Sequence, residues 1–307
     1  MQIVSFVLPC LGRNPSGGFK MIYEYANALA EHGYRVNLLF DVSRSLKRFH
    51  MPEYLRYMCV ELLNRIYPRW FYLHPNVKKK CLHGIKDEEV PDGDYIFATA
   101  IHTAFDVQRL SQTKGEKLYF IQGFEAWAGF KAADVHQSYQ LGMKNIVISK
   151  WLEKEVNAHA DRPAIYIPNF VKTDVFFIGT KPEMRNPYSI AMLCAVGDYK
   201  GCKYGLAALK KLKKIYPQLQ AHLFGTIKNV EGLEDWMNYT FSASEQELRR
   251  IYNTSAIYLY PAVKEGWGLT GMEAMACGCA YVSSDYGGVH EYADDGKEVL
   301  LSQPRDV

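Results

Sequence analysis

Short apolar runs alternate along the chain with longer segments whose apolar residues recur at helical spacing. Residues 2–9 are apolar, too short for a helix and followed by a turn, so they predict a buried strand. Residues 19–32 have the helical spacing, Gly33 is suited to end that helix, and residues 36–40 predict a second buried strand. A glycine-rich loop, residues 12–18, joins the first strand to the helix. A strand, loop, helix and strand in this order indicate a parallel sheet.

The alternation continues through the rest of the chain. Further strands are predicted at residues 95–98, 117–122, 145–149, 189–196, 219–224, 256–260 and 280–283. Helices are predicted at residues 103–110, 132–141, 204–216, 242–253 and 271–277. The helix predicted at residues 242–253 has a plausible capping box from Ser242 to Glu245. Two prolines and several polar residues in residues 179–187 break both periodicities and indicate a linker. The sequence therefore predicts two open α/β domains, residues 1–178 and 179–307, with a ligand-binding cleft between their strand ends.

The composition excludes several classes of protein. The 307 residues include 36 Lys and Arg against 33 Asp and Glu, and 48% are hydrophobic, which excludes a disordered, collagenous or coiled-coil chain. No run of 18 apolar residues predicts a transmembrane helix, and the N-terminus lacks the basic start of a signal peptide. The seven cysteines are odd in number and contain no CxxC pair, so we expect free thiols in a reducing compartment.

Residues 44–86 differ from the rest because basic and aromatic residues are interleaved there with few acidic ones. Two interpretations stay open. The segment could dock on anionic lipid headgroups. Alternatively it is a helical insertion that packs its aromatic residues on the first domain. Binding of nucleic acid is not expected, since the rest of the chain is almost neutral.

The most informative stretch is residues 265–280. Glu265 and Glu273 lie eight residues apart and are joined by a glycine-rich loop that opens a helix. A helix N-terminus offers free N–H donors and the positive end of its dipole, and the glycines let a diphosphate approach the backbone. One carboxylate could then accept hydrogen bonds from ribose hydroxyls and the other from a sugar.

This stretch resembles the E-x7-E region of family 4 glycosyltransferases, which have the GT-B fold of two Rossmann-like domains facing across a cleft. The resemblance extends over most of the chain through residues 16–18, 167–169 with Asp174, 200–201, 247–252, 260–261, 283–292 and 295–296. A further resemblance, of residues 119–127, is to enzymes that make rhamnan and related surface polysaccharides.

The resemblance implies a role for each matching residue. Glu273 would bind the ribose, Glu265 would hold hydroxyls of the donor sugar, and Lys200 would neutralise phosphate charge. The base would stack near residues 239–242. Backbone groups in two loops would meet the diphosphate and sugar, namely Gly268, Leu269 and Thr270 in the second domain and Gly17 and Gly18 in the first.

Structural alternatives stand beside these roles. Glu273 could be the capping-box partner of Thr270, Glu265 a solvated loop carboxylate, and Lys200 an ordinary surface lysine. Asp92-Gly93-Asp94 matches a metal-binding D-x-D pattern, but it directly precedes a predicted strand and is better explained as a turn.

Three features depart from the family pattern. The arginine that usually precedes Lys200-Gly201 is missing, and Asp198 stands in that loop. Gln122 takes the place of a usual histidine, which leaves His102 as the histidine candidate for catalysis and Glu125 as another cleft residue. The chain ends at Val307, before the helices that usually cross back to the first domain, so the second domain is expected to be truncated.

The expected function is transfer of a hexose, with retention of configuration, from a nucleotide-diphosphate sugar to a glycan or lipid-linked acceptor in surface polysaccharide synthesis. The resemblance implies no metal and no cofactor, and a cytoplasmic enzyme that could also sit on the inner face of the membrane. The alternative is a non-catalytic module that binds a nucleotide or a glycan. An NAD enzyme is disfavoured, because residues 16–19 do not supply the G-x-G-x-x-G that should follow the first strand.

Overall fold

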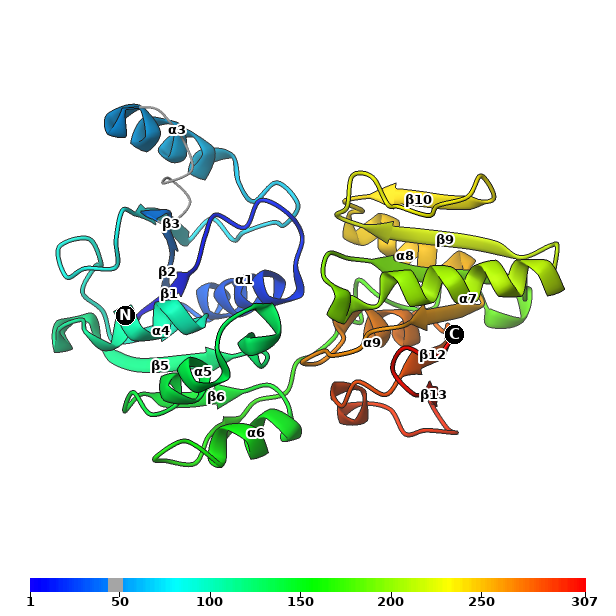
Figure 1. Ribbon diagram of the computed structural model, residues 1–307. Helices are drawn as coiled ribbons and strands as arrows, with labels where there is room; N and C mark the ends of the chain where they lie inside the picture. Colours follow the sequence, from blue (N-terminus) through cyan, green and yellow to red (C-terminus); the bar gives the residue numbers. More distant parts are fainter. Residues whose placement is uncertain (44–51) are drawn as a thin grey trace. The chain divides into compact units, whose positions relative to one another are not determined.

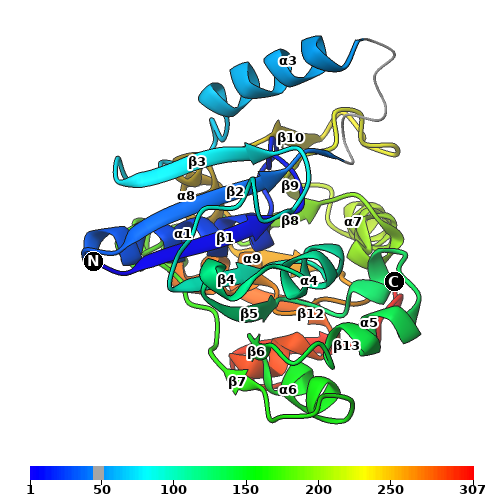
Figure 2. The same ribbon diagram turned by 90° about the vertical axis from the view of Figure 1, so that its left-hand side faces the viewer.

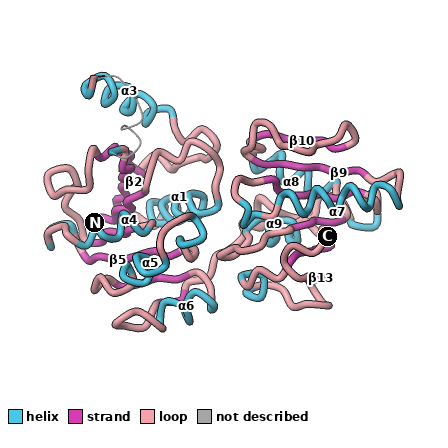
Figure 3. Tube along the Cα trace, in the orientation of Figure 1, coloured by secondary structure: helices cyan, strands magenta, loops and turns pink. Residues whose placement is uncertain are grey.

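The computed structural model describes residues 1–43 and 52–307 and is shown in Figure 1. The chain divides into two compact units, Met1–Pro168 and Asn169–Val307. In each unit, strands alternate with helices along the chain, as Figure 3 shows. No helix among the described residues is both long and apolar enough to cross a membrane.

The first unit is built on a seven-stranded parallel sheet with the strand order β3-β2-β1-β4-β5-β6-β7, seen in Figure 2. Its strands are β1 (Ile3–Leu8), β2 (Arg35–Asp41), β3 (Val77–Leu82), β4 (Tyr95–Ala98), β5 (Glu116–Ile121), β6 (Lys144–Val147) and β7 (Ile165–Tyr166). Its α-helices are α1 (Gly17–Glu31), α3 (Glu53–Ile66), α4 (Ile101–Gln108), α5 (Ala132–Ser138) and α6 (Lys150–Asn157).

The second unit has a six-stranded parallel sheet with the order β10-β9-β8-β11-β12-β13. Its strands are β8 (Ser189–Cys194), β9 (Gln220–Gly225), β10 (Met237–Phe241), β11 (Ile257–Tyr260), β12 (Ala280–Ser284) and β13 (Val299–Ser302). Its α-helices are α7 (Cys202–Ile215), α8 (Glu245–Thr254) and α9 (Leu269–Ala276). Helix α7 contributes to one apolar core of this unit, and α8 and α9 contribute to another, so both faces of the sheet are covered.

Residues 44–86 are not a purely helical insertion. Residues 44–51 lie outside the described residues, and the remainder contains both α3 and the strand β3. β3 does not look like a strand in the sequence, because it contains a run of three lysines. In the structure, the ammonium of the middle one, Lys79, donates to the carbonyl oxygen of Tyr67 at 2.6 Å. The aromatic rings of Trp70 and Phe71 pack against Tyr23 of α1, at 5.6 and 5.3 Å between ring centroids.

Residues 179–187 are not a linker between the two units. The Arg185 side chain is only 7% exposed and donates hydrogen bonds to the carbonyl oxygens of Thr180, Tyr252, Ser255 and Cys277. Three of these carbonyls belong to the ends of α8 and α9, whose last carbonyls lack partners within their own helices. The segment therefore belongs to the second unit.

Residues 169–178, which the sequence analysis placed in the first domain, also fold with the second unit. Phe176 is 1% exposed and packs in the same core as Tyr252 of α8. The Gly179 amide donates to the Asn253 side chain at 2.6 Å. These contacts fix the chain well before the proline-rich stretch that suggested a boundary.

The capping box of α8 is Ser244 with Glu247 and not Ser242 with Glu245. The Ser244 hydroxyl accepts from the Glu247 amide, and the Glu247 carboxylate accepts from the Ser244 amide. Both pairs have the required spacing, but Ser242 lies in the turn after β10 with φ +52°, whereas a helix N-cap needs an extended backbone.

Candidate functional site

The loops that follow β8 and β11 bring two charged residues together. The two strands are neighbours in a parallel sheet, so their C-terminal ends open onto the same edge. Lys200 ends the single 3-10 turn Asp198–Lys200 after β8, and Glu265 follows β11. The Lys200 ammonium contacts the Glu265 carboxylate, which also accepts from the Tyr260 hydroxyl at 2.7 Å and from the Gly266 amide at 3.1 Å.

The electrostatics of this pair favour both charges. Burial alone would raise the pKa of Glu265, but the Lys200 ammonium, the Tyr260 hydroxyl and the Gly266 amide together hold it below its ordinary value. Burial would lower the pKa of Lys200, and the Glu265 carboxylate reverses this and raises it. Their side chains are only 21% and 19% exposed. Lys200 is therefore no ordinary surface lysine, and Glu265 is no solvated loop carboxylate.

Helix α9 begins directly after this pair, at Gly268. The Gly268 backbone has φ +89°, a left-handed conformation that favours glycine. An added Cβ would lie 2.2 Å from the Tyr286 hydroxyl oxygen. The Tyr292 hydroxyl donates to the Gly268 carbonyl at 3.0 Å, and the Tyr286 hydroxyl donates to the Trp267 carbonyl at 3.2 Å. Because these carbonyls are bound from within the protein, the loop conformation before α9 is fixed.

Three tyrosine hydroxyls form a cluster beneath this loop. Tyr286 and Tyr292 are 2.6 Å apart at their hydroxyl oxygens, and Tyr281 is 3.1 Å from Tyr286. The sequence analysis included Tyr286 and Tyr292 in the resemblance and placed Tyr281 in a predicted strand, but it gave none of them a role in shaping the loop. The sequence gives no sign that the three hydroxyls meet. They come together only when β12 and the segment that follows it pack against α9.

Glu273 lies in the second turn of α9 and is 5% exposed. The Tyr252 hydroxyl donates to its carboxylate at 3.4 Å. A capping box with Thr270 is wrong, because the helix already begins at Leu269 and places Thr270 inside its first turn. The Thr270 hydroxyl instead accepts from Tyr258 at 2.8 Å.

A hollow of about 820 Å³ adjoins the loop that carries Lys200 in the second unit. Its lining includes Gly197 and Asp198 from that loop, Lys203 from α7 and Ile227 after β9. Asp198 is paired with Lys203 at 3.1 Å, so its charge is partly compensated by a cation in the same wall. Tyr239, from the region expected to stack on a base, donates to the Ile227 carbonyl at 2.7 Å.

In the first unit, the candidates Gly18 and Gln122 meet at the C-terminal edge of the sheet. Gly18 is the second residue of α1, after the loop from β1, and Gln122 directly follows β5. The Gln122 amide donates to the Gly18 carbonyl at 3.1 Å. Gly17 is the first residue of α1, whose N-cap Ser16 accepts from the Phe19 amide at 3.4 Å. The sequence signal at these glycines thus corresponds to a helix N-terminus.

Glu125 lies at the same edge and contacts the start of α4. Its carboxylate accepts from the Ile101 amide at 2.7 Å and from the Tyr119 hydroxyl at 3.1 Å. Burial raises the pKa of Glu125 to about 7, although both hydrogen bonds act in the opposite direction. His102 is the second residue of α4, and its ring stacks near Phe130 with 6.4 Å between centroids.

The D-x-D pattern does not form a shared site. Asp92 pairs with Lys114 at 2.8 Å and accepts from Thr113, whereas Asp94 accepts from the Ile3 amide at 2.7 Å. Both residues thus serve the turn that precedes β4.

Comparison with known proteins shows what the chain is similar to. Residues 173–307 match the protein family described as "Glycosyl transferases group 1". The match covers all but the first four residues of the second unit. Alpha-maltose-1-phosphate synthase of Mycolicibacterium smegmatis is 40% identical over 55 residues, which are 18% of this chain and 14% of that protein. The D-inositol 3-phosphate glycosyltransferase of Paenarthrobacter aurescens is 21% identical over 291 residues, 86% of this chain and 69% of that protein.

Solved structures show the same architecture over the whole chain. Sucrose-phosphate synthase from Thermosynechococcus elongatus has a TM-score of 0.74 at 16% identity, covering 100% of this chain and 87% of that one. The Anabaena protein HepE, in complex with UDP and glucose, has a TM-score of 0.72 at 14% identity, covering 99% and 86%. The fold is that of the GT-B glycosyltransferases, with one parallel-sheet Rossmann-like domain in each unit.

Proposed function

We propose that the protein is a retaining glycosyltransferase that moves a hexose from a nucleotide-diphosphate sugar to a glycan or lipid-linked acceptor of a surface polysaccharide. The observation that carries the proposal is the pairing of Lys200 with Glu265 directly before the N-terminus of α9. A cation, a carboxylate and free helix N–H groups then stand together at a strand edge where α/β folds bind ligands.

The chemistry requires stabilisation of charge that develops on the leaving diphosphate. Lys200 and the first N–H groups of α9, at Leu269 and Thr270, would supply it electrostatically. Glu265 would hold hydroxyls of a donor sugar that becomes oxocarbenium-like. Lys200 would then exchange part of its contact with Glu265 for phosphate, so the ion pair keeps both groups charged and oriented before the donor arrives.

The nucleoside would extend along the second unit. Glu273 would accept hydrogen bonds from the ribose, and the base would stack near residues 239–242. The role of Glu273 rests on the E-x7-E spacing, and that of residues 239–242 on their place at the C-terminal end of β10.

The candidates of the first unit would serve the acceptor and the donor phosphates. Gly17 and Gly18 supply a helix N-terminus, and Gln122 holds the Gly18 carbonyl. Glu125, with a pKa near neutrality, is suited to exchange a proton with an acceptor hydroxyl, and His102 stands one residue from the Ile101 amide that Glu125 binds.

The names of similar proteins support the substrate class. O-antigen chain mannosyltransferase B of Escherichia coli is 32% identical over 74 residues, although these are only 19% of that protein. One HepE structure contains UDP-glucose. We propose that transfer needs no metal or cofactor and takes place in the cytoplasm. On α3, Tyr54, Met58 and Leu62 are 64%, 67% and 59% exposed at a spacing of four residues, which would suit contact with the membrane surface.

A thermal-shift panel of UDP, GDP, dTDP and CDP tests the proposal, with Glu273→Ala as the site variant and Glu183→Ala, at an exposed position, as the matched control. A ligand at 100 times its Kd should add about 2.7 kcal/mol of stability. We expect one nucleotide to stabilise the wild type and the control but not Glu273→Ala. No shift with any nucleotide would contradict the proposal, and binding without transfer or donor hydrolysis would favour a non-catalytic module.

A further inference from the structure

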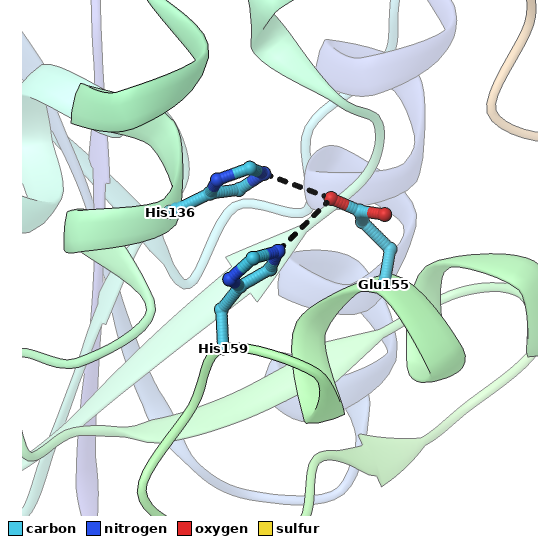
Figure 4. Close-up of side chains that lie close together, drawn as sticks. All are labelled: His136, Glu155 and His159. Carbon is cyan, nitrogen blue, oxygen red and sulfur yellow. Dashed lines mark hydrogen bonds and ion pairs between the residues drawn. The ribbon is translucent and has the colours of Figure 1, made fainter.

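We propose that His136, Glu155 and His159 form a binding site for a divalent transition metal ion of the Zn²⁺ class. The three side chains come from α5, from α6 and from the turn that follows α6, and they converge on one point in Figure 4. None of them belongs to the residues assigned to sugar transfer, so the site is a second, separate function of the first unit.

The distances between the ligand atoms suit a small ion. The Glu155 Oε1 atom lies 2.9 Å from His136 Nε2 and 3.8 Å from His159 Nε2. Two atoms that bind a tetrahedral Zn²⁺ at about 2.1 Å are about 3.4 Å apart. The observed separations bracket this value, and the three ligand atoms all lie within 4.8 Å of one another. Small rotations of the side chains would therefore place all three around one ion.

The backbone that carries these side chains is well anchored. Glu155 and His159 are four residues apart, which puts them on one face of the helical turn. Leu152 and Val156 of α6 are fully buried, and the His159 carbonyl accepts from the Gln140 side chain at 2.8 Å. Val135 of α5, next to His136, is 1% exposed. The fold thus fixes the backbone positions from which the three side chains extend.

The ligand set has the chemistry that Zn²⁺ and its neighbours prefer. Two imidazoles and one carboxylate combine borderline nitrogen ligands with one negative charge. The side chains are 28%, 33% and 36% exposed in chain order, which leaves room for water to complete the coordination.

The imidazole rings of His136 and His159 are stacked, with 3.6 Å between their centroids and an angle of 12° between their planes. An ion in front of both Nε2 atoms would draw those atoms together and splay the rings. Metal binding would also link α5 to the end of α6, so the expected consequence is stabilisation of this part of the first unit.

Titration of the full-length chain with Zn²⁺ against a chromophoric chelator tests the proposal. The exposed thiols of Cys10 and Cys59 could also bind zinc, so every protein in the test carries Cys10→Ser and Cys59→Ser. The site variants are His159→Ala and Glu155→Gln. The matched control is Glu153→Gln, which removes the same charge from the same helix, where Glu153 pairs with Lys150.

We expect one equivalent of Zn²⁺ to bind to the background protein and to the control, and binding to weaken at least about tenfold in each site variant. Circular dichroism without metal shows whether the variants fold. With Co²⁺ in place of Zn²⁺, the background protein should give visible absorption typical of a four- or five-coordinate ion with nitrogen and oxygen ligands. Equal stoichiometry and affinity in all the proteins, or no binding at all, would overturn the proposal and leave a hydrogen-bonded His–Glu cluster.

Discussion

The Lys200 ammonium contacts the Glu265 carboxylate across 65 positions of sequence. Neither residue belongs to a regular strand or α-helix, and the contact exists because β8 and β11 are neighbours in the sheet. Each charge is stabilised chiefly by the other against the cost of burial. This mutual dependence makes the pair open to a double-mutant test.

Removal of one partner should destabilise the fold, because the other charge is left buried without compensation. We expect Lys200→Met and Glu265→Gln each to lower the free energy of unfolding by about 3 kcal/mol. The double variant should lose less than the sum of the two single variants. Urea denaturation measures all three.

The activity of the same variants should behave differently. All three should transfer sugar at least about 100-fold more slowly, because the double variant regains stability but still lacks the groups proposed to bind phosphate and sugar. A double variant that regains turnover along with stability would contradict the catalytic role of the pair. Lys203→Met, in the neighbouring exposed pair with Asp198, is the matched control.

Gly268→Ala should destabilise the protein and weaken donor binding. The added methyl would meet the Tyr286 hydroxyl at 2.2 Å in a backbone with φ +89°. We expect a loss of about 3 kcal/mol, part from backbone strain and part from the clash. The comparison is Gly296→Ala, which has φ +75° but nothing within 4 Å of the added atom and should lose only about 1 kcal/mol.

The clash can be tested separately from the strain. Tyr286→Phe removes the hydroxyl that the added methyl would meet, so it should recover part of the stability lost in Gly268→Ala. If Gly268→Ala and Gly296→Ala lower the free energy of unfolding equally, the close contact with Tyr286 does not contribute to the effect of Gly268→Ala.

Glu125 should make stability fall as the pH rises. Its pKa is about 7 in the folded protein against an ordinary value of 4.5, so the folded state holds the proton more tightly. The stabilisation is fully present below about pH 4.5 and is lost as the pH rises through about 7. It amounts to about 3 kcal/mol at most, since each pKa unit corresponds to about 1.4 kcal/mol.

Glu125→Gln should remove this dependence while keeping an oxygen that can accept from the Ile101 amide. Thermal unfolding between pH 4.5 and 8 measures the slope for the wild type, for Glu125→Gln and for the exposed control Glu31→Gln. A wild-type slope that survives in Glu125→Gln would show that another group is responsible.

Arg185→Leu should be among the most destabilising substitutions in the second unit. It would remove the guanidinium that donates to the carbonyls of Thr180, Tyr252, Ser255 and Cys277. We expect a loss of about 4 kcal/mol in urea denaturation. Arg109→Leu, whose side chain is 72% exposed, should change stability by less than about 0.5 kcal/mol. Similar values for the two variants would contradict the anchoring role of Arg185.

The strands that could be predicted from the sequence are those made of a continuous run of buried apolar residues. Residues 95–98 were predicted as β4 with the same bounds, and the strands from β8 to β12 were located to within two residues, with the exception of β10. β10 and β13 were missed, because these edge strands have fewer buried positions. β3 was missed because its run of three lysines resembles a solvent-exposed segment. Only the structure shows that the Lys79 ammonium has a backbone carbonyl as a partner.

The candidate site was predictable as a set of residues but not as an arrangement. The spacing of Glu265 and Glu273 follows from the sequence, and so does the glycine-rich loop between them. The contact of Lys200 with Glu265 does not, because it depends on the order of strands in the sheet. The contact of Glu125 with Ile101 likewise joins two loops that no local pattern connects.

Arg185 also limits where a shortened polypeptide that contains only the second unit can begin. Residues 169–187 carry Phe176 and Arg185, which fill the core and bind the helix ends of the second unit. A shorter polypeptide that starts at the apparent boundary, residue 179, would lose Phe176, and one that starts at β8 would lose both. Separate production of the second unit should therefore begin no later than Asn169, and a boundary chosen from the sequence pattern alone would discard part of its core.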